Sequence, residues 1–212
     1  MIKIENGMKK YKDRIVLEDI NFTFEDGKMY GITGVNGSGK TLIAKALSGY
    51  IKLTSGKVIQ DNTEIRKSNN YIQNAGIIIE TPVLVNEFTV NENLNYLKKM
   101  SKNSDNIDLN KWYDFFEISK YKDTLFSNLS LGTKQKVGLI QALMDEPQTL
   151  ILDEPFNSLD KATSKKVQDY LIDKKKEGRL VIFITHINDN ILEKCDTIIE
   201  ISEGKIVDIK NN

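Results

Sequence analysis

The stretch Gly34-Val35-Asn36-Gly37-Ser38-Gly39-Lys40-Thr41 governs how the rest of this sequence is interpreted. A strand-like run at residues 29–33 precedes it, and a helix-like run at residues 42–47 follows it. That context separates a phosphate-binding loop from a chance match. Glycines adopt backbone conformations that other residues avoid, so successive N–H groups can turn inward around a polyphosphate at the start of a helix. The alternative is a glycine-rich turn before an ordinary helix. The phosphate loop is favoured over it, because the strand, the Lys-Thr pair and the helix all occur together here.

The loop residues have distinct expected roles. Lys40 would reach the β- and γ-phosphates of a nucleotide, and the Thr41 hydroxyl would ligate Mg²⁺. The other residues of the loop would contribute mainly backbone N–H groups. The predicted nucleotide-binding residues here are Gly34, Asn36, Gly37, Ser38, Gly39, Lys40, Thr41 and Leu42.

Composition excludes several classes of protein. Among 212 residues, Lys plus Arg and Asp plus Glu each total 30, so no net charge attracts nucleic acid or anionic lipid. The longest apolar runs, such as residues 180–184, are far shorter than the roughly 18 residues of a membrane span. The first residues lack the apolar region of a secretion signal, and the single cysteine, Cys195, cannot form an internal disulfide. These features predict a cytoplasmic protein that neither binds nucleic acid nor inserts into lipid.

Hydrophobic periodicity predicts strands that alternate with helices. Residues 2–11 and 15–25 alternate as half-buried strands do, and residues 75–79 form an apolar run typical of a strand buried on both faces. Apolar strands are also expected at residues 149–152 and 180–184, with a polar helix at about 161–177 between them. Strands that alternate with helices favour parallel pairing and right-handed crossovers, so we expect an α/β fold.

The middle of the chain has helical signals instead. Thr89-Val90-Asn91-Glu92 has the spacing of a capping box, with Thr89 capping a helix that continues to about Met100 and Glu92 reaching back. Trp112, Phe115, Phe116 and Ile118 are expected to belong to a small helical core. Residues 81–145 are therefore predicted to form a mostly helical insertion between strands.

Two acidic residues and one histidine follow the late strands. An apolar strand that ends in Asp153-Glu154 is the usual partner of a phosphate loop, since Asp153 can hold hydrated Mg²⁺ there. Glu154 would act on the water in line with the γ-phosphate, as general base or as its positioner. His186 directly follows residues 180–185, and parallel strands would bring it to the same edge, beside the γ-phosphate. The alternatives are an Asp-Glu-Pro sequence that only ends a strand and an ordinary surface or core histidine.

These motifs together resemble those of one family, the nucleotide-binding domain of ATP-binding cassette (ABC) proteins, and the resemblance covers essentially the whole chain. It adds to the loop and the Asp-Glu pair a signature-like sequence, a D-loop-like sequence, a switch histidine and an aromatic residue for stacking on adenine. The motifs are, respectively, Leu129-Ser130-Leu131-Gly132-Thr133-Lys134-Gln135, Asn157-Ser158-Leu159-Asp160, His186 and Tyr11. The order and spacing of these motifs together are far more specific than any one of them.

The sequence departs from the family pattern at two places. The family signature usually reads Leu-Ser-Gly-Gly-Gln, and Leu131 and Thr133 occupy its third and fifth positions here. Ser130 and Gly132, the positions with which the family contacts the γ-phosphate across a dimer, are kept. In the Q-loop, Glu80 aligns with the usual glutamine, and its carboxylate can still ligate Mg²⁺. These departures resemble cassettes that serve bacterial exporters of peptides, antibiotics and lantibiotics.

The resemblance implies a P-loop ABC ATPase fold with a mainly parallel core sheet. Residues 1–212 would form one domain: 1–80 and 146–212 the RecA-like core with an N-terminal antiparallel β subdomain, and 81–145 a helical subdomain. It implies an ATPase that uses ATP and Mg²⁺, dimerises around two ATP molecules and drives transport, with export of a peptide or antibiotic expected. Its partners would be an integral membrane permease and a second copy or homologous ATP-binding subunit, at the cytoplasmic face of the cell membrane.

Two other functions remain open from the sequence. A soluble ABC ATPase that acts on DNA or ribosomes would resemble this chain around the nucleotide site, but such proteins carry a long coiled coil or two cassettes. A non-hydrolysing regulatory module would fit the altered signature, although Lys40, Asp153, Glu154 and His186 oppose it.

Overall fold

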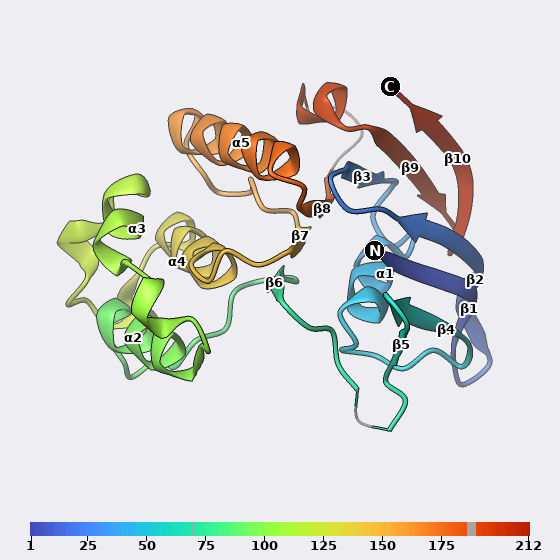
Figure 1. The fold of residues 1–212 in the computed structure, drawn as a ribbon, viewed down its shortest axis with the longest axis horizontal. Helices are drawn as coiled ribbons and strands as arrows, with labels where there is room; N and C mark the ends of the chain where they lie inside the picture. Colours follow the sequence, from blue (N-terminus) through green and yellow to red (C-terminus); the bar gives the residue numbers. More distant parts are fainter. Residues whose placement is uncertain (69, 186–189) are drawn as a thin grey trace.

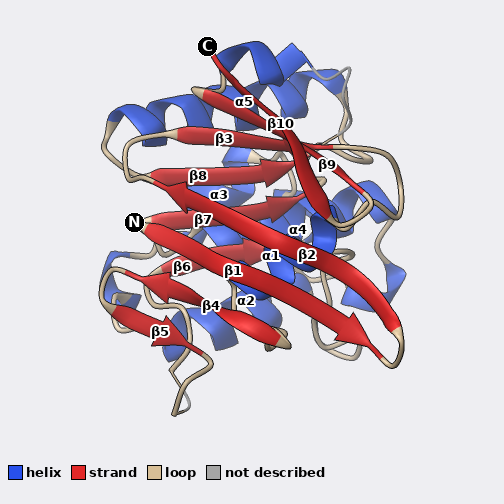
Figure 2. Ribbon diagram, turned by 90° about the vertical axis from the view of Figure 1, so that its right-hand side faces the viewer, coloured by secondary structure: helices blue, strands red, loops and turns tan. Residues whose placement is uncertain are grey.

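The chain folds around two β-sheets. The structure is a computed structural model that describes residues 1–68, 70–185 and 190–212. The smaller sheet is antiparallel and has the strand order β2-β1-β4-β5. Its strands are β1 (Ile2–Tyr11), β2 (Arg14–Phe24), β4 (Ser55–Gln60) and β5 (Thr63–Ile65). Figure 2 shows this sheet crossing in front of the larger one.

The larger sheet has six strands in the order β10-β9-β3-β8-β7-β6. The strands are β3 (Met29–Thr33), β6 (Ala75–Ile78), β7 (Thr149–Asp153), β8 (Leu180–Ile184), β9 (Thr197–Ser202) and β10 (Lys205–Asn211). All neighbouring pairs from β9 to β6 are parallel, and only β10 runs antiparallel to its neighbour. The predicted α/β fold with a mainly parallel core sheet and an N-terminal antiparallel sheet is therefore confirmed.

Helix α1 (Lys40–Leu47) lies between the two sheets, as Figure 1 shows. Alternate residues of each central strand face opposite layers. Ile182 of β8 packs with α1 and the antiparallel sheet, whereas Phe183 packs in the cluster on the other face. Because both faces of β8 are covered, all five of its residues are buried, as expected for a central parallel strand.

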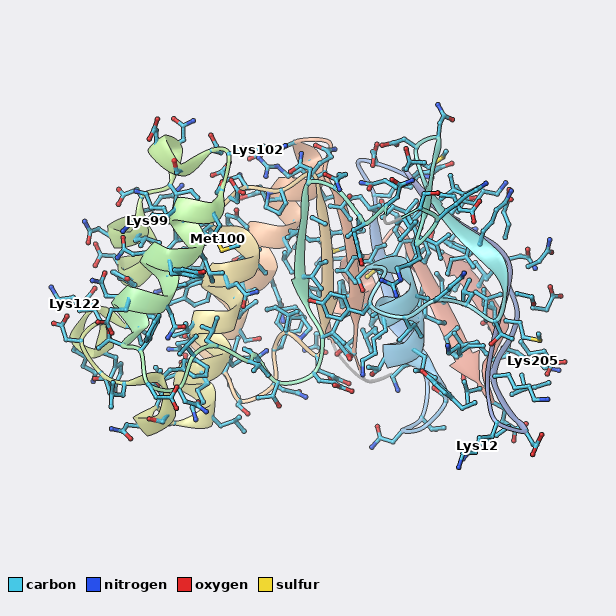
Figure 3. All side chains as sticks on the ribbon, turned by 90° about the horizontal axis from the view of Figure 1, so that it is seen from below. Lys12, Lys99, Met100, Lys102, Lys122 and Lys205 are labelled. Atoms are coloured by element: carbon cyan, nitrogen blue, oxygen red, sulfur yellow. The ribbon has the colours of Figure 1, made fainter. Side chains whose placement is uncertain are left out.

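The other helices lie on the opposite side of the larger sheet from α1. Helices α4 (Leu131–Leu143) and α5 (Lys161–Lys176) pack against its strands, and α2 (Val90–Met100) and α3 (Leu109–Phe115) lie beyond α4 (Figure 1). The 3-10 turns are η1 (Ser104–Asn106), η2 (Ser119–Tyr121), η3 (Phe126–Asn128) and η4 (Asn190–Lys194). The predicted capping box at Thr89 and Glu92 is present at the start of α2. In Figure 3, Lys99 and Met100 of α2 lie in the opposite half of the molecule from Lys12, in the turn between β1 and β2, and Lys205 of β10.

One prediction about β6 is wrong. The apolar run at residues 75–79 was expected to be buried on both faces, but Ala75 and Ile77 are only half-buried, while Gly76 and Ile78 are buried. The reason is the position of the strand, because β6 is the edge of the larger sheet and has only β7 beside it. Hydrophobicity alone does not distinguish an edge strand of this kind from a central one.

No helix in the described parts of the chain combines the length and the hydrophobicity that crossing a bilayer requires.

Candidate functional site

The glycine-rich loop connects the end of β3 with the start of α1. Three of its glycines have positive φ: Gly34 at 143°, Gly37 at 80° and Gly39 at 110°. A Cβ atom on Gly34 would lie 2.1 Å from the carbonyl oxygen of Ile201, so the loop could not pass β9 this closely with a larger residue. A Cβ atom on Gly37 would meet nothing within 4 Å, which leaves open space on that side of the loop. The loop therefore wraps around a position that its own side chains do not fill.

Lys40 folds back over this loop. Its Nζ donates hydrogen bonds to the carbonyl oxygens of Gly34 at 2.7 Å and Val35 at 3.0 Å, and only 7% of the residue is exposed. Within the described parts of the chain, both hydrogen-bond acceptors of this buried ammonium group are neutral carbonyl oxygens. Beneath the loop, Ser38 Oγ is buried and, among the described residues, has no hydrogen-bond partner. Both groups are donors that a bound phosphate would satisfy.

Asp153 stands at the end of β7, next to the helix that follows the loop. The hydroxyl of Thr41 donates to Asp153 Oδ2 at 2.8 Å. Burial raises the pKa of the Asp153 carboxyl, and hydrogen bonds from Thr41 and from the backbone N–H of Glu80 oppose that rise. A hydroxyl and a carboxylate at this separation are oxygen ligands of the type that Mg²⁺ prefers.

The residues after Asp153 form a turn with an unusual backbone. Glu154 has φ of 49° and Ser158 has φ of 62°, both in the left-handed region that residues with side chains rarely occupy. The Glu154 N–H donates to the carbonyl oxygen of Ile184 at 3.0 Å, which fastens the turn to β8. Gln135 of α4 reaches the turn as well, since its Nε2 donates to the carbonyl oxygen of Pro155 at 3.2 Å. Non-glycine residues in such conformations cluster at functional sites.

A cavity of about 530 Å³ joins the loop, the end of β7 and this turn. It brings together nine of the residues predicted from the sequence: Asn36, Gly37, Gly39, Lys40, Thr41, Leu42, Glu80, Asp153 and Glu154. It is also lined by Thr81, Leu131, Gln135, Asn157 and Ser158, which the sequence had not assigned to this site. Of these, Leu131 and Gln135 belong to the signature-like sequence, and Asn157 and Ser158 belong to the D-loop-like one. Membership of these motifs could have identified the four residues as part of the site.

Ser130 and Gly132 do not line this cavity. Ser130 is the N-cap of α4, and its Oγ accepts the Thr133 N–H at 3.3 Å and lies 2.9 Å from the Thr133 hydroxyl. Gly132 approaches the D-loop closely, because a Cβ atom on it would lie 2.5 Å from the carbonyl oxygen of Ser158. The two predicted residues of the signature therefore sit at a helix N-terminus outside the phosphate-loop cavity of their own chain.

Two other predicted residues lie apart from the cavity or outside the described residues. Tyr11, at the end of β1, is 47% exposed, and the Lys9 ammonium lies 4.7 Å from the centre of its ring. Its exposed ring can stack on a planar base, although it does not line the cavity. His186 lies outside the described residues, so its role stays a prediction.

Glu80 lines the cavity, and its carboxylate has a partner within the chain. Its φ is 60°, and its Oε1 forms an ion pair with Lys45 Nζ at 2.7 Å. Lys45 belongs to α1 but to no recognised motif, so no signal in the sequence pointed to it. The metal role predicted for Glu80 stays a prediction.

These residues fit a nucleotide with its Mg²⁺ ion. The open side of Gly37, the buried Lys40 ammonium and the orphaned Ser38 hydroxyl suit phosphate oxygens, and Thr41 and Asp153 suit the ion. A glycine-rich loop at the end of one parallel strand, with a buried aspartate at the end of another, defines a P-loop nucleotide-binding protein.

Comparisons with known proteins identify the family within that class. The family model described as ABC transporter matches residues 17–157. The ABC transporter ATP-binding protein YybJ of Bacillus subtilis is 34% identical over 206 residues, which cover 97% of this chain and 94% of that protein. The chain belongs to the ABC transporter family, and it is an ATP-binding ATPase domain of that family.

Relatives with named transport roles are similar over nearly the whole chain. The bacitracin transport ATP-binding protein BcrA of Enterococcus faecalis is 34% identical, with 100% of this chain and 69% of that protein covered. The lantibiotic transport ATP-binding protein SrtF of Streptococcus pyogenes is 32% identical, with 98% and 89% covered. A solved ATP-binding subunit of an ABC transporter has a TM-score of 0.89 and 25% identity, with 100% of this chain and 90% of that chain covered.

Proposed function

We propose that this chain is the ATP-hydrolysing subunit of a membrane transporter that exports a peptide or antibiotic. Lys40 and the N–H groups of the loop bind the β- and γ-phosphates, and Tyr11 stacks on adenine. Thr41 and Asp153 hold Mg²⁺, which when bound neutralises charge on the phosphate oxygens. The support for these assignments is the cavity in which the loop, Thr41 and Asp153 meet.

Hydrolysis is assigned to the residues after the two central strands. Glu154 lines the cavity and would take the proton of the attacking water, or hold that water in line with the γ-phosphate. His186 would contact the γ-phosphate and the same water, as its place in the sequence two residues after the end of β8 suggests. Glu80, which also lines the cavity, is a further metal ligand in this proposal.

The observation that best supports this function is the position of Ser130 and Gly132. In the family motif, the residues at these two positions contact the γ-phosphate. Here they lie outside the phosphate-loop cavity of their own chain. A second chain can supply them, so that each ATP is enclosed between the loop of one protomer and the signature helix of the other. Such a site is complete only in a dimer, and removal of the γ-phosphate weakens the dimer. The difference in dimer affinity is then available to move a permease.

A permease would bind at the helical end of the molecule. Val85, Phe88 and Leu125 are exposed there, and the Phe126 N–H donates to the Phe88 carbonyl oxygen at 2.9 Å, so the two segments lie side by side. Exposed apolar side chains gathered in this way favour a protein partner. The named roles of the bacitracin and lantibiotic relatives support a peptide or antibiotic as cargo.

The test uses Glu154→Gln. This variant should bind ATP, hydrolyse it about 10²–10³-fold more slowly, and form a dimer with ATP and Mg²⁺ in light scattering after size-exclusion chromatography. Addition of Ser130→Arg should keep the variant monomeric without loss of ATP binding. Hydrolysis by Glu154→Gln at the wild-type rate would refute the assignment of Glu154. Purification of the protein from detergent-solubilised membranes tests the permease, because an integral membrane protein should co-purify through the Val85 and Phe88 surface.

A further inference from the structure

The ion pair between Lys45 and Glu80 connects two elements that border the phosphate cavity. Lys45 lies in the last turn of α1, the helix that starts at the phosphate loop, and Glu80 follows β6. Their side chains meet at 2.7 Å, and the Lys45 side chain is only 25% exposed. An exposed ion pair of this kind contributes little to stability, so its significance lies in where it places charge.

Glu80 is bound in two directions at once. Its backbone N–H faces the Asp153 carboxylate, while its side chain points to Lys45. The left-handed backbone at Glu80, with φ of 60°, makes this arrangement possible. The Glu80 carboxylate is therefore paired with Lys45 of α1 while Glu80 still lines the cavity with Thr41 and Asp153.

The charges of the cavity make this placement important. Its lining includes three carboxylates, Glu80, Asp153 and Glu154, and one lysine, Lys40. A polyphosphate carries negative charge as well, so an unpaired Glu80 carboxylate repels it when no Mg²⁺ is present. A carboxylate that is free to move is, in contrast, a good ligand for the ion.

We propose that Lys45 is a positioning residue that competes with the metal ion for the Glu80 carboxylate. Lys45 holds the Glu80 carboxylate away from the phosphates of a metal-free nucleotide. The ion pair must break before Glu80 can become a metal ligand. The proposal rests on the nucleotide site put forward above. It predicts opposite changes in nucleotide binding and metal binding when Lys45 is removed.

Lys45→Met is the variant that tests it. With EDTA present, its affinity for a fluorescent ATP analogue should fall about threefold to tenfold, since Glu80 is no longer neutralised. Its affinity for Mn²⁺ in the presence of saturating nucleotide, measured by electron paramagnetic resonance, should rise by a similar factor. Structural damage at α1 would weaken both, so only the opposite signs support the proposal.

Two control variants separate charge from shape. Lys45→Arg keeps the cation and should behave as the wild type in both titrations. Glu80→Gln should bind metal-free nucleotide more tightly and Mn²⁺ more weakly, and Lys45→Met should have a clearly smaller effect in that background than in the wild type. Independent effects of the two substitutions would refute the competition between them.

Lys40→Met distinguishes failure of this inference from failure of the nucleotide site. If the wild type binds the analogue, Lys40→Met does not, and Lys45→Met matches the wild type in both titrations, only the role of Lys45 is refuted. If the wild type and Lys40→Met bind equally, the phosphate-loop assignment and the role of Lys45 are both refuted.

Discussion

The Thr41 hydroxyl lies 2.8 Å from Asp153 Oδ2, although the two residues are 112 positions apart in the sequence. This bond connects the first turn of α1 with the end of β7 and places both candidate metal ligands at one point. Because Asp153 is nearly completely buried there, its ionised form is costly without a bound cation. The site therefore favours a bound cation, because Lys40 supplies only part of the positive charge that would balance the carboxylates.

Asp153→Asn should make the nucleotide-free protein more resistant to urea at pH 7. Burial raises the pKa of Asp153 in the folded state, so the protonated carboxyl is favoured there. The stability contributed by this group is full below the unfolded-state pKa of about 4 and is lost as pH rises through the higher folded-state pKa. The advantage of the variant should therefore shrink as pH is lowered toward 4. Asp145→Asn serves as the control, and an Asp153→Asn protein less stable than the wild type at pH 7 would contradict the expectation.

Lys40→Met should lose most of its affinity for ATP, by roughly tenfold or more, because it removes the one lysine that lines the phosphate cavity. The check is thermal unfolding with and without ATP. Ligand at about 100 times its Kd stabilises a folded protein by roughly 2.7 kcal/mol, and this variant should show little of that gain. Lys12→Met, in the exposed turn between β1 and β2, should retain the full ATP-dependent shift.

Gly132→Ala should lower the free energy of unfolding by about 1–3 kcal/mol, since the added methyl group would overlap the Ser158 carbonyl oxygen. Urea unfolding measures this change. Leu131→Ala, at the exposed neighbouring position, is the matched control and should cost much less. Equal midpoints for Gly132→Ala and the wild type would show that the D-loop can move away without cost.

Thr89→Ala should destabilise the protein by about 1 kcal/mol, because Thr89 caps α2. A hydrogen bond from the Thr89 N–H lowers the pKa of Glu92, so the stability that Glu92 contributes is present above its unfolded-state pKa and is lost as pH falls through the lower folded-state pKa. Glu92→Gln keeps an acceptor and should lack this loss at acidic pH. Chemical unfolding of the three proteins between pH 3 and 7 provides the comparison. A wild type and a Glu92→Gln variant with the same pH profile would count against this role of Glu92.

Local patterns in the sequence predicted most of the framework. The phosphate loop, the buried strands β7 and β8 and the capping box at Thr89 each depend on residues close together in the chain. Alternation and spacing therefore predict them. The edge position of β6 was missed because strand order depends on pairing between distant segments, which hydrophobicity does not encode.

The finer geometry of the site was outside the reach of the sequence. Glu80, Glu154 and Ser158 all adopt left-handed backbones around one cavity, and these residue types give no warning of that conformation. The ion pair between Lys45 and Glu80 depends on the left-handed backbone of Glu80. A motif identifies the residues that approach a ligand, but it does not indicate which neighbouring side chains form hydrogen bonds or ion pairs with them.

The central position of β3 has a consequence for how the protein is made. β3 ends in the phosphate loop and lies between β8 and β9, which come about 150 residues later in the chain. The Gly204 N–H also donates to the Ser38 carbonyl oxygen at 2.8 Å and secures the loop. During synthesis, the loop emerges from the ribosome early, but β3 has no strand to pair with until β8 and β9 follow. A nascent chain that stops before residue 180 therefore carries the phosphate loop, Asp153 and Glu154 without β8 and β9, the two strands that pair with β3.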